Sequence, residues 1–130
     1  MKSRFFELDG KRFVIVSTNG AGGRSPVEQT ELTFTRLKDG LEKLDCRFEN
    51  VLRVTFFMKG REVWKTVREF RQRVFGTGAR PASSSIFVQR FLPEEALVEV
   101  EATAIVGNKA IVKQAIEFEP PRMYLKALVA

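Results

Sequence analysis

The chain has 130 residues, with 22 lysines and arginines against 16 aspartates and glutamates, no histidine and a single cysteine. Without histidine, no Ser-His-Asp or Cys-His nucleophile pair can form. Cys46 alone builds neither a thiolate zinc site nor an intrachain disulfide. We therefore expect no metal and no cofactor, and any catalysis has to use carboxylates, hydroxyls, backbone amides, Lys, Arg or bound water.

The length predicts one domain over residues 1–130. The fractions of hydrophobic residues (44%) and charged residues (29%) are typical of soluble globular proteins. No signal-peptide pattern is visible, and no stretch reaches the ~18 apolar residues of a membrane span, so we expect a cytoplasmic protein without a membrane partner. The net charge of +6 raises the question of nucleic acid, but most basic soluble proteins do not bind it, and this partner is not favoured.

The first part of the chain predicts a hairpin and a helix. Two runs of β-favouring residues, 5–8 and 11–17, flank an Asp-Gly pair that is typical of a tight turn. The glycine-rich loop 19–23 lacks the pattern of a phosphate-binding loop, which leaves an active-site rim or a plain connector. Ser25 and Pro26 are typical of the N-cap and first position of a helix. The apolar stripe of this helix is Phe34, Leu37, Leu41 and Leu44.

The middle of the chain predicts a strand over residues 51–59 and a second helix after Gly60. Apolar residues at helical spacing form the inner face of this helix, and basic residues fall largely on its outer side. That basic side is either an anion footprint or a solvated helix face, and the second reading is favoured. The inner residues are Val63, Val67, Phe70 and Val74, and the outer ones are Lys65, Arg68, Arg71 and Arg73.

The last part predicts strands over residues 84–89, 97–106 and 109–118. Residues 97–106 alternate, which places Val98, Val100, Ala102, Ala104 and Val106 on one face and Glu99, Glu101, Thr103 and Ile105 on the other. The order ββαβαβββ predicts an α+β domain with two helices on one face of a mixed sheet. We expect residues 107–130 to form a C-terminal extension with one extra strand.

Two groups of side chains can carry chemistry. Glu99 and Glu101 point the same way about 7 Å apart, which makes them either surface charges or, under cover of another subunit, a pair in which one pKa is raised. Ser83, Ser84 and Ser85 stand at the entry to a strand. Without an activating histidine, they are better suited to hydrogen bonding with a ligand or with their own loop than to nucleophilic attack.

Several segments together resemble the RidA/YjgF family, which is also described as L-PSP endoribonuclease-like. They are residues 50–60, the second helix, Arg80-Pro81-Ala82, Leu92-Pro93 and the run 98–104, within a resemblance that spans residues 13–106. This resemblance implies a chorismate-mutase-like fold assembled as a homotrimer. The sheets would form an inner barrel with the helices outside and three ligand pockets between subunits.

The resemblance also implies a set of site residues. The family's glutamate, which positions the attacking water, matches Glu101, and its hydroxyl-glycine pair matches Thr18-Asn19. The family's cysteine matches Ser85, and the arginine that clamps the substrate carboxylate in active imine deaminases matches Ser83. Further expected ligand contacts are Phe87 as an apolar wall and Arg90, Arg80 or Arg24 as a replacement for the clamp.

With Ser83 in place of the arginine, the charged contact with the substrate carboxylate is lost. Such a loss in a buried site commonly costs about 2–5 kcal/mol, so we do not expect a standard 2-iminobutanoate/2-iminopropanoate deaminase. The favoured function is a pathway-specific step on a small reactive intermediate, such as hydrolysis of an imine or enamine, or tautomerisation. A non-catalytic trimer that binds a small molecule is the alternative. RNA binding or cleavage is less favoured, because no RNA-recognition motif is visible and histidine is absent.

Overall fold

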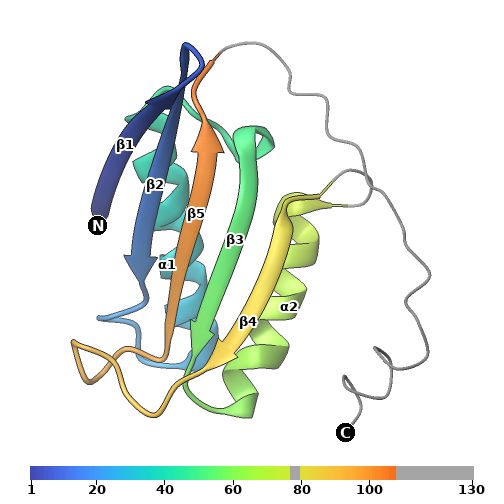
Figure 1. Ribbon diagram of the computed structural model, residues 1–130. Helices are drawn as coiled ribbons and strands as arrows, with labels where there is room; N and C mark the ends of the chain where they lie inside the picture. The colour runs from blue at the N-terminus through green and yellow to red at the C-terminus, as the bar shows by residue number, and fades with distance from the viewer. Residues whose placement is uncertain (77–79, 108–130) are drawn as a thin grey trace, which may run out of the picture.

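The computed structural model describes residues 1–76 and 80–107, and the predicted strand 109–118 lies outside them. Five strands form one mixed sheet in the order β1-β2-β5-β3-β4, with β3 and β4 parallel and the other pairs antiparallel. Both long helices cover the same face of this sheet and leave the other face open (Figure 1). The predicted α+β architecture is confirmed. The elements are β1 (Lys2–Leu8), β2 (Lys11–Asn19), α1 (Pro26–Glu42), the short 3-10 helix η1 (Phe48–Asn50), β3 (Val51–Met58), α2 (Arg61–Phe75), β4 (Ala82–Phe87) and β5 (Val98–Ile105).

The N-terminal hairpin forms as the sequence predicts. Asp9 and Gly10 both have positive φ values, 51° and 74°, which suit the tight turn that joins twisted antiparallel strands. The first strand begins at Lys2, three residues earlier than predicted, and pairs with β2 from Lys2↔Ser17 to Leu8↔Lys11. Every residue of β1 is exposed, so its first residues carry no hydrophobic alternation that would have marked the start.

Helix α1 begins where its capping residues predict. The Ser25 hydroxyl accepts a hydrogen bond from the Glu28 amide at 3.1 Å. Its apolar stripe is buried against the sheet, although the helix ends at Glu42, so that Leu44 packs on the core from beyond it. Gly40 has a packing role, since a Cβ atom there would lie 3.0 Å from the Cγ1 of Val16.

The core fills the space between the sheet and the two helices. β5 contributes the predicted inward row, of which Val98, Val100, Ala102 and Ala104 are fully buried, while Val106 lies beyond the strand and is half-buried. Phe56 of β3 is the largest fully buried side chain. Phe34, also buried, stacks on Phe70 of α2 with 5.7 Å between the ring centroids.

The edge strand β4 begins and ends two residues earlier than predicted, at Ala82 and Phe87 rather than at 84 and 89. Its limits are set by parallel pairing with β3, from Arg53↔Ala82 to Met58↔Phe87. Such pairing is a long-range property of the sheet and leaves no local mark in a run of serines.

Candidate functional site on the uncovered sheet face

The two carboxylates of β5 point to the uncovered face of the sheet. Glu101 is exposed and Glu99 is half-exposed, while their neighbours in the strand are buried under the helices. Because β5 lies in the middle of the sheet, each carboxylate has a partner on both sides. Glu101 is flanked by Ser17 of β2 and Thr55 of β3.

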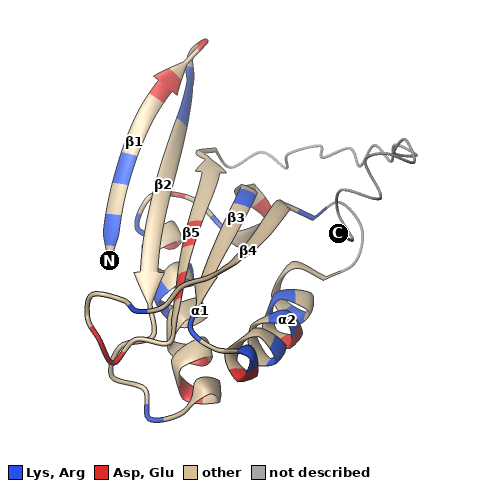
Figure 2. Cartoon of the chain, turned by 60° about the horizontal axis from the view of Figure 1, so that its bottom comes forward, with Lys and Arg blue, Asp and Glu red and all other residues tan. Residues whose placement is uncertain are grey.

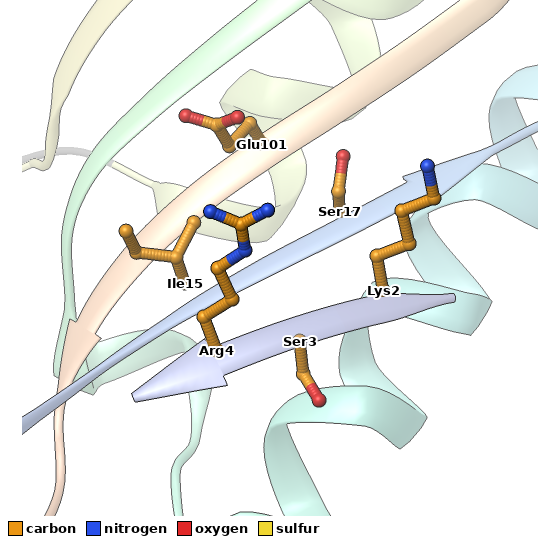
Figure 3. Close-up of a pocket in the computed structure, with 6 residues that line it drawn as sticks. All are labelled: Lys2, Ser3, Arg4, Ile15, Ser17 and Glu101. Atoms are coloured by element: carbon orange, nitrogen blue, oxygen red, sulfur yellow. The ribbon is translucent and has the colours of Figure 1, made fainter. Parts of the chain in front are cut away.

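A pocket of about 280 Å³ lies on this face beside Glu101. Figure 3 shows the guanidinium of Arg4 reaching across Ile15 toward the Glu101 carboxylate, with the ammonium of Lys2 on the side of Ser17. The lining thus combines a carboxylate, two cations and two serines, of which Ser3 points away from the other side chains. Its residues are Lys2, Ser3, Arg4, Ile15, Ser17 and Glu101.

The surroundings of Glu99 shift the pKa of its carboxyl group. The pKa of Glu99 is raised, mainly because its partial burial disfavours the charged form and further because of the negative charge of Glu101. The positive charge of Lys2 acts in the opposite sense and lowers this pKa. From the sequence, we expected a raised pKa in this pair only if another subunit covers the two carboxylates. In the structure it arises within one chain, at Glu99.

Thr18 lies on the opposite face of the sheet from Glu101. It is 2% exposed, and its hydroxyl donates a hydrogen bond to the Thr33 carbonyl of α1 at 2.9 Å. The structure therefore does not bring Thr18 to the Glu101 pocket, and the hydroxyl there belongs to the preceding residue, Ser17. A shift of one residue along a strand moves a side chain to the other face, and only the pairing with β5 reveals which residue faces the pocket.

The Asn19 side chain and the glycine-rich loop are joined by hydrogen bonds within the chain. The Asn19 side chain accepts a hydrogen bond from the Ala21 amide at 2.9 Å. The Gly20 amide donates to the Val98 carbonyl at 3.0 Å, and the Gly23 amide donates to the Gly20 carbonyl at 3.1 Å. The N–H groups of Gly20, Ala21 and Gly23 are therefore engaged within the chain, which favours the plain connector over an active-site rim.

Gln29 of α1 explains the glycines in this loop. A Cβ atom at Gly20 would lie 2.6 Å from the Gln29 side chain, so only glycine allows this close approach. The buried Gln29 amide group donates to the carbonyls of Gly23 and Glu95 and accepts from the Leu97 amide. The loop is thus a packed connector that fixes the ends of β2 and β5.

The expected ligand contacts of β4 lie together, but away from Glu101. Ser83, Ser85 and Phe87 pair with the buried row of β3 and so belong to the helix side of this edge strand. The Ser83 hydroxyl accepts a hydrogen bond from Nη1 of Arg71 at 3.0 Å. Ser85 is exposed, and Phe87 is 55% exposed. Within one chain, β3 and the thickness of the sheet separate them from Glu101.

The three arginines considered as a replacement clamp are all exposed and lie far apart in the sequence. Arg24 precedes α1, where its backbone amide donates to the Glu28 carboxylate at 2.7 Å. Arg90 belongs to the connection between β4 and β5. Arg80 lies beside Pro81 at the start of β4 and lines a small pocket with Arg71 and Ser83.

Sequence reasoning missed Lys2, Arg4 and Ser17. The signal that finds them is the hairpin register, because Lys2 pairs with Ser17 and Arg4 with Ile15, which puts these side chains on the face of Glu101. The predicted hairpin stopped at Phe5, so this register did not extend to the two cations.

A comparison with protein families shows to which family this chain belongs. Residues 11–106 match the family model described as Endoribonuclease L-PSP. The chain belongs to this family. Among curated members, a RutC family protein of Synechocystis is 32% identical over 85 residues, and the RutC family protein UK114 of Drosophila melanogaster is 34% identical over 83 residues. These matches cover 65% and 64% of this chain, and only 65% and 59% of the two relatives' own lengths.

Solved structures agree with this family assignment. A member of the YjgF/YER057c/UK114 family from Mycobacterium tuberculosis is 27% identical and has a TM-score of 0.65, with 72% of this chain and 79% of that chain covered. The sheet with two helices on one face is therefore the fold of the Endoribonuclease L-PSP family. Neither helix within residues 1–76 and 80–107 has the length and hydropathy needed to cross a membrane.

Proposed function

We propose that this member of the Endoribonuclease L-PSP family is a divergent homotrimer that acts on a small reactive imine, enamine or related intermediate between its subunits. Glu101 would position and activate the attacking water. The observation that carries this proposal is the position of Glu101, whose carboxylate lines an open pocket with Arg4, Lys2 and Ser17 on the uncovered sheet face. A carboxylate beside donors and cations is suited to proton transfer that involves bound water.

The character of the uncovered face supports an assembly. Apolar side chains accompany the carboxylates there, and the edge strand adds Ile86, which is 44% exposed. A sheet face of this mixed kind gains by packing against a second sheet. The half-exposed apolar residues of this face include Phe13, Ile15, Phe57 and Ile105. A neighbouring copy would cover this face and bring its own β4 edge toward Glu101.

The proposed hydrolysis uses only groups of this chain and water. Glu101 accepts a proton from water as the water oxygen forms a bond to the imine carbon, and the π electrons of the C=N bond move to nitrogen, which takes up a proton. The proton taken up by nitrogen is the one that Glu101 accepted from water. Glu101 next accepts the proton of the new hydroxyl group and passes it to nitrogen as the C–N bond breaks, so that ammonia leaves and the carbonyl product forms. Arg4 and Lys2 stabilise negative charge that develops near the pocket, and the Ser17 hydroxyl orients the water.

Ser83 supports a substrate different from the simplest imino acids. The resemblance places an arginine at this position in active imine deaminases, and a serine cannot form the two parallel hydrogen bonds of a guanidinium with a carboxylate. We therefore propose that 2-iminopropanoate and 2-iminobutanoate are not the preferred substrates.

Ammonia release tests this proposal. An amino acid oxidase generates imines in situ from a series of amino acids, and the release of ammonia is followed with and without the protein. We expect acceleration only for imines larger than 2-iminobutanoate, and we expect Glu101→Gln to lower the rate about 100-fold or more. Rapid turnover of 2-iminopropanoate or 2-iminobutanoate, or full activity of Glu101→Gln on an accepted substrate, would overturn the proposal.

Ser83 also favours a second candidate function, a trimer that binds a small molecule without turnover. Native mass spectrometry of the purified protein separates the two. A ligand that co-purifies and is released unchanged, with no reaction on any imine tested, supports the binding protein.

A further inference from the structure

The outer side of α1 carries a line of acidic side chains. Its members are exposed and are three, eight and three positions apart, and such spacings return to the same side of a helix. They lie on the side of α1 away from the buried Leu37 and Leu41, so they point away from the sheet. Lys38 is the exposed cation of this helix. We call these residues the acidic line, and they are Glu28, Glu31, Asp39 and Glu42.

The outer side of α2 carries a line of basic side chains. Its members are exposed, are four and three positions apart, and lie on the side of α2 away from its buried valines. The Arg68 guanidinium lies over the Trp64 ring at 4.7 Å from the centroid, which holds this cation on the helix surface. The exposed Glu62 and Glu69 fall to one side of the line. We call the three cations the basic line, and they are Arg61, Lys65 and Arg68.

The two lines run alongside each other. Helix α1 joins β2 to β3 and α2 joins β3 to β4, and these three strands run in the same direction. The two helices therefore also run in the same direction, and they touch where Phe34 stacks on Phe70. Figure 2 shows red segments on α1 and mainly blue segments on α2. The outer surface of the helix layer is thus negative along one half and positive along the other.

The charges of the two lines are not neutralised by ion pairs within the described chain. Among residues 1–76 and 80–107, the ion pair joins Arg12 to Glu7 in the N-terminal hairpin, and no member of either line takes part in one. The Glu28 carboxylate accepts a hydrogen bond from the Arg24 amide at 2.7 Å. Like charges at helical spacing repel each other, so each line gains from a neighbour of opposite sign.

We propose that this surface binds the same surface of a second copy of the chain. A two-fold axis parallel to the helices and midway between the two surfaces sets the acidic line of each copy against the basic line of the other. Lines of opposite charge that lie side by side make the surface complementary to itself, which is what a two-fold interface requires. An acidic or a basic partner of another kind would match only one of the two lines.

This contact does not depend on the proposed trimer. The trimer would use the uncovered face of the sheet, and the helix layer lies on the opposite side (Figure 1). One copy can therefore take part in both contacts, and the helix layer would join one trimer to another.

The dependence of assembly size on salt tests this proposal. Sedimentation velocity of the full chain is measured in about 20 mM and about 500 mM sodium chloride, at up to about 100 μM protein, since exposed ion pairs form weak contacts. We expect larger assemblies at low salt. The dissociation constant should rise about tenfold or more at high salt, because the charges are then screened. The same assembly size at both salt concentrations would overturn the proposal.

Charge reversal assigns the contact to the two lines. One variant makes both lines basic and the other makes both lines acidic, and we expect neither to associate with itself at low salt, because like charges then face each other. An equimolar mixture should associate at low salt, since a basic surface then meets an acidic one. Glu28 is kept because its carboxylate is bonded to the Arg24 amide. The variants are E31K/D39K/E42K and R61E/K65E/R68E.

A matched control carries the same change in net charge outside the helices. E49K/E94K/E95K reverses three exposed acidic residues, and we expect it to keep most of the association. An equal loss in this control and in the acidic-line variant would indicate a general effect of net charge and overturn the proposal. Failure of the mixture to associate would do the same, with circular dichroism showing that both variants are folded.

The basic line alone could instead serve an anionic polymer. Heparin is added to the parent and to R61E/K65E/R68E at low salt. If the parent copies stay apart but bind heparin through these three residues, the partner is a polyanion and the proposed contact between copies is wrong.

Discussion

The two faces of the sheet are built from the same strands and differ in what their side chains do. Toward the helices, β2, β3 and β5 contribute fully buried aliphatic and aromatic residues, and the hydroxyl of Thr18 is hydrogen-bonded to α1. Toward the uncovered side, the alternate residues include Glu99, Glu101 and Ser17, beside the cations of β1. The comparison shows that stability and chemistry are separated by the two-residue period of the strands.

The covered face should account for most of the folding free energy. Phe56→Ala removes the largest fully buried side chain, and we expect it to lower the free energy of unfolding by about 3–5 kcal/mol in urea denaturation. Leu8→Ala at the hairpin tip is the control, because Leu8 is 60% exposed, and its cost should be within about 1 kcal/mol. Equal losses for the two variants would contradict the assignment of the core to the helix side.

Neighbouring hydroxyls on the two faces should respond in opposite ways. Thr18→Val removes the buried hydrogen bond to Thr33, and we expect a loss of about 1–3 kcal/mol in the free energy of unfolding. Ser17→Ala should leave this free energy within about 0.5 kcal/mol and instead lower the rate of imine hydrolysis about tenfold. Denaturation and ammonia release measure the two effects. If Thr18→Val lost activity while its free energy of unfolding stayed normal, Thr18 would have to act in the functional site.

The smallest expected effect concerns the pH dependence of stability. Burial raises the pKa of Glu99 above its value in the unfolded chain, so the folded state holds the proton more tightly. Stability should therefore fall as the pH rises from the ordinary glutamate range through the raised pKa, where the folded protein must ionise a partly buried group. Glu99→Gln should remove this loss, so that the variant is slightly the more stable at neutral pH in denaturation series. A variant as sensitive to pH as the parent would contradict the assignment to Glu99.

Local signals in the sequence were sufficient for most of the fold. The Asp-Gly turn, the Ser25-Pro26 cap and the alternation of β5 each act over a few residues, and each is confirmed. The limits of β4 could not be predicted, because they depend on parallel pairing with a strand far away in the chain. The family resemblance correctly gave the fold, and the family model confirms membership.

The candidate site was only partly predictable. The pattern of β5 correctly placed Glu101 on the face away from the core, but nothing local distinguishes Ser17 from Thr18, since both are small hydroxyl residues of one strand. For Arg71, helical spacing alone left an anion footprint or a solvated helix face and favoured the second. Its turn toward Ser83 depends on how α2 packs beside β4, which is a tertiary property.

The central claim is that Glu101 of one copy works with the β4 edge of its neighbour, and subunit complementation tests it most directly. Glu101→Gln chains, and Ser83→Trp chains whose bulky side chain should block the β4 edge, are each expected to lose most of the activity alone. The two are co-expressed, and ammonia release is measured on an accepted imine. In mixed trimers, each interface has the two intact residues with a chance of about one quarter, so we predict recovery of about one quarter of the parent activity. No recovery, in a sample that native mass spectrometry shows to contain mixed trimers, would contradict a site shared between copies.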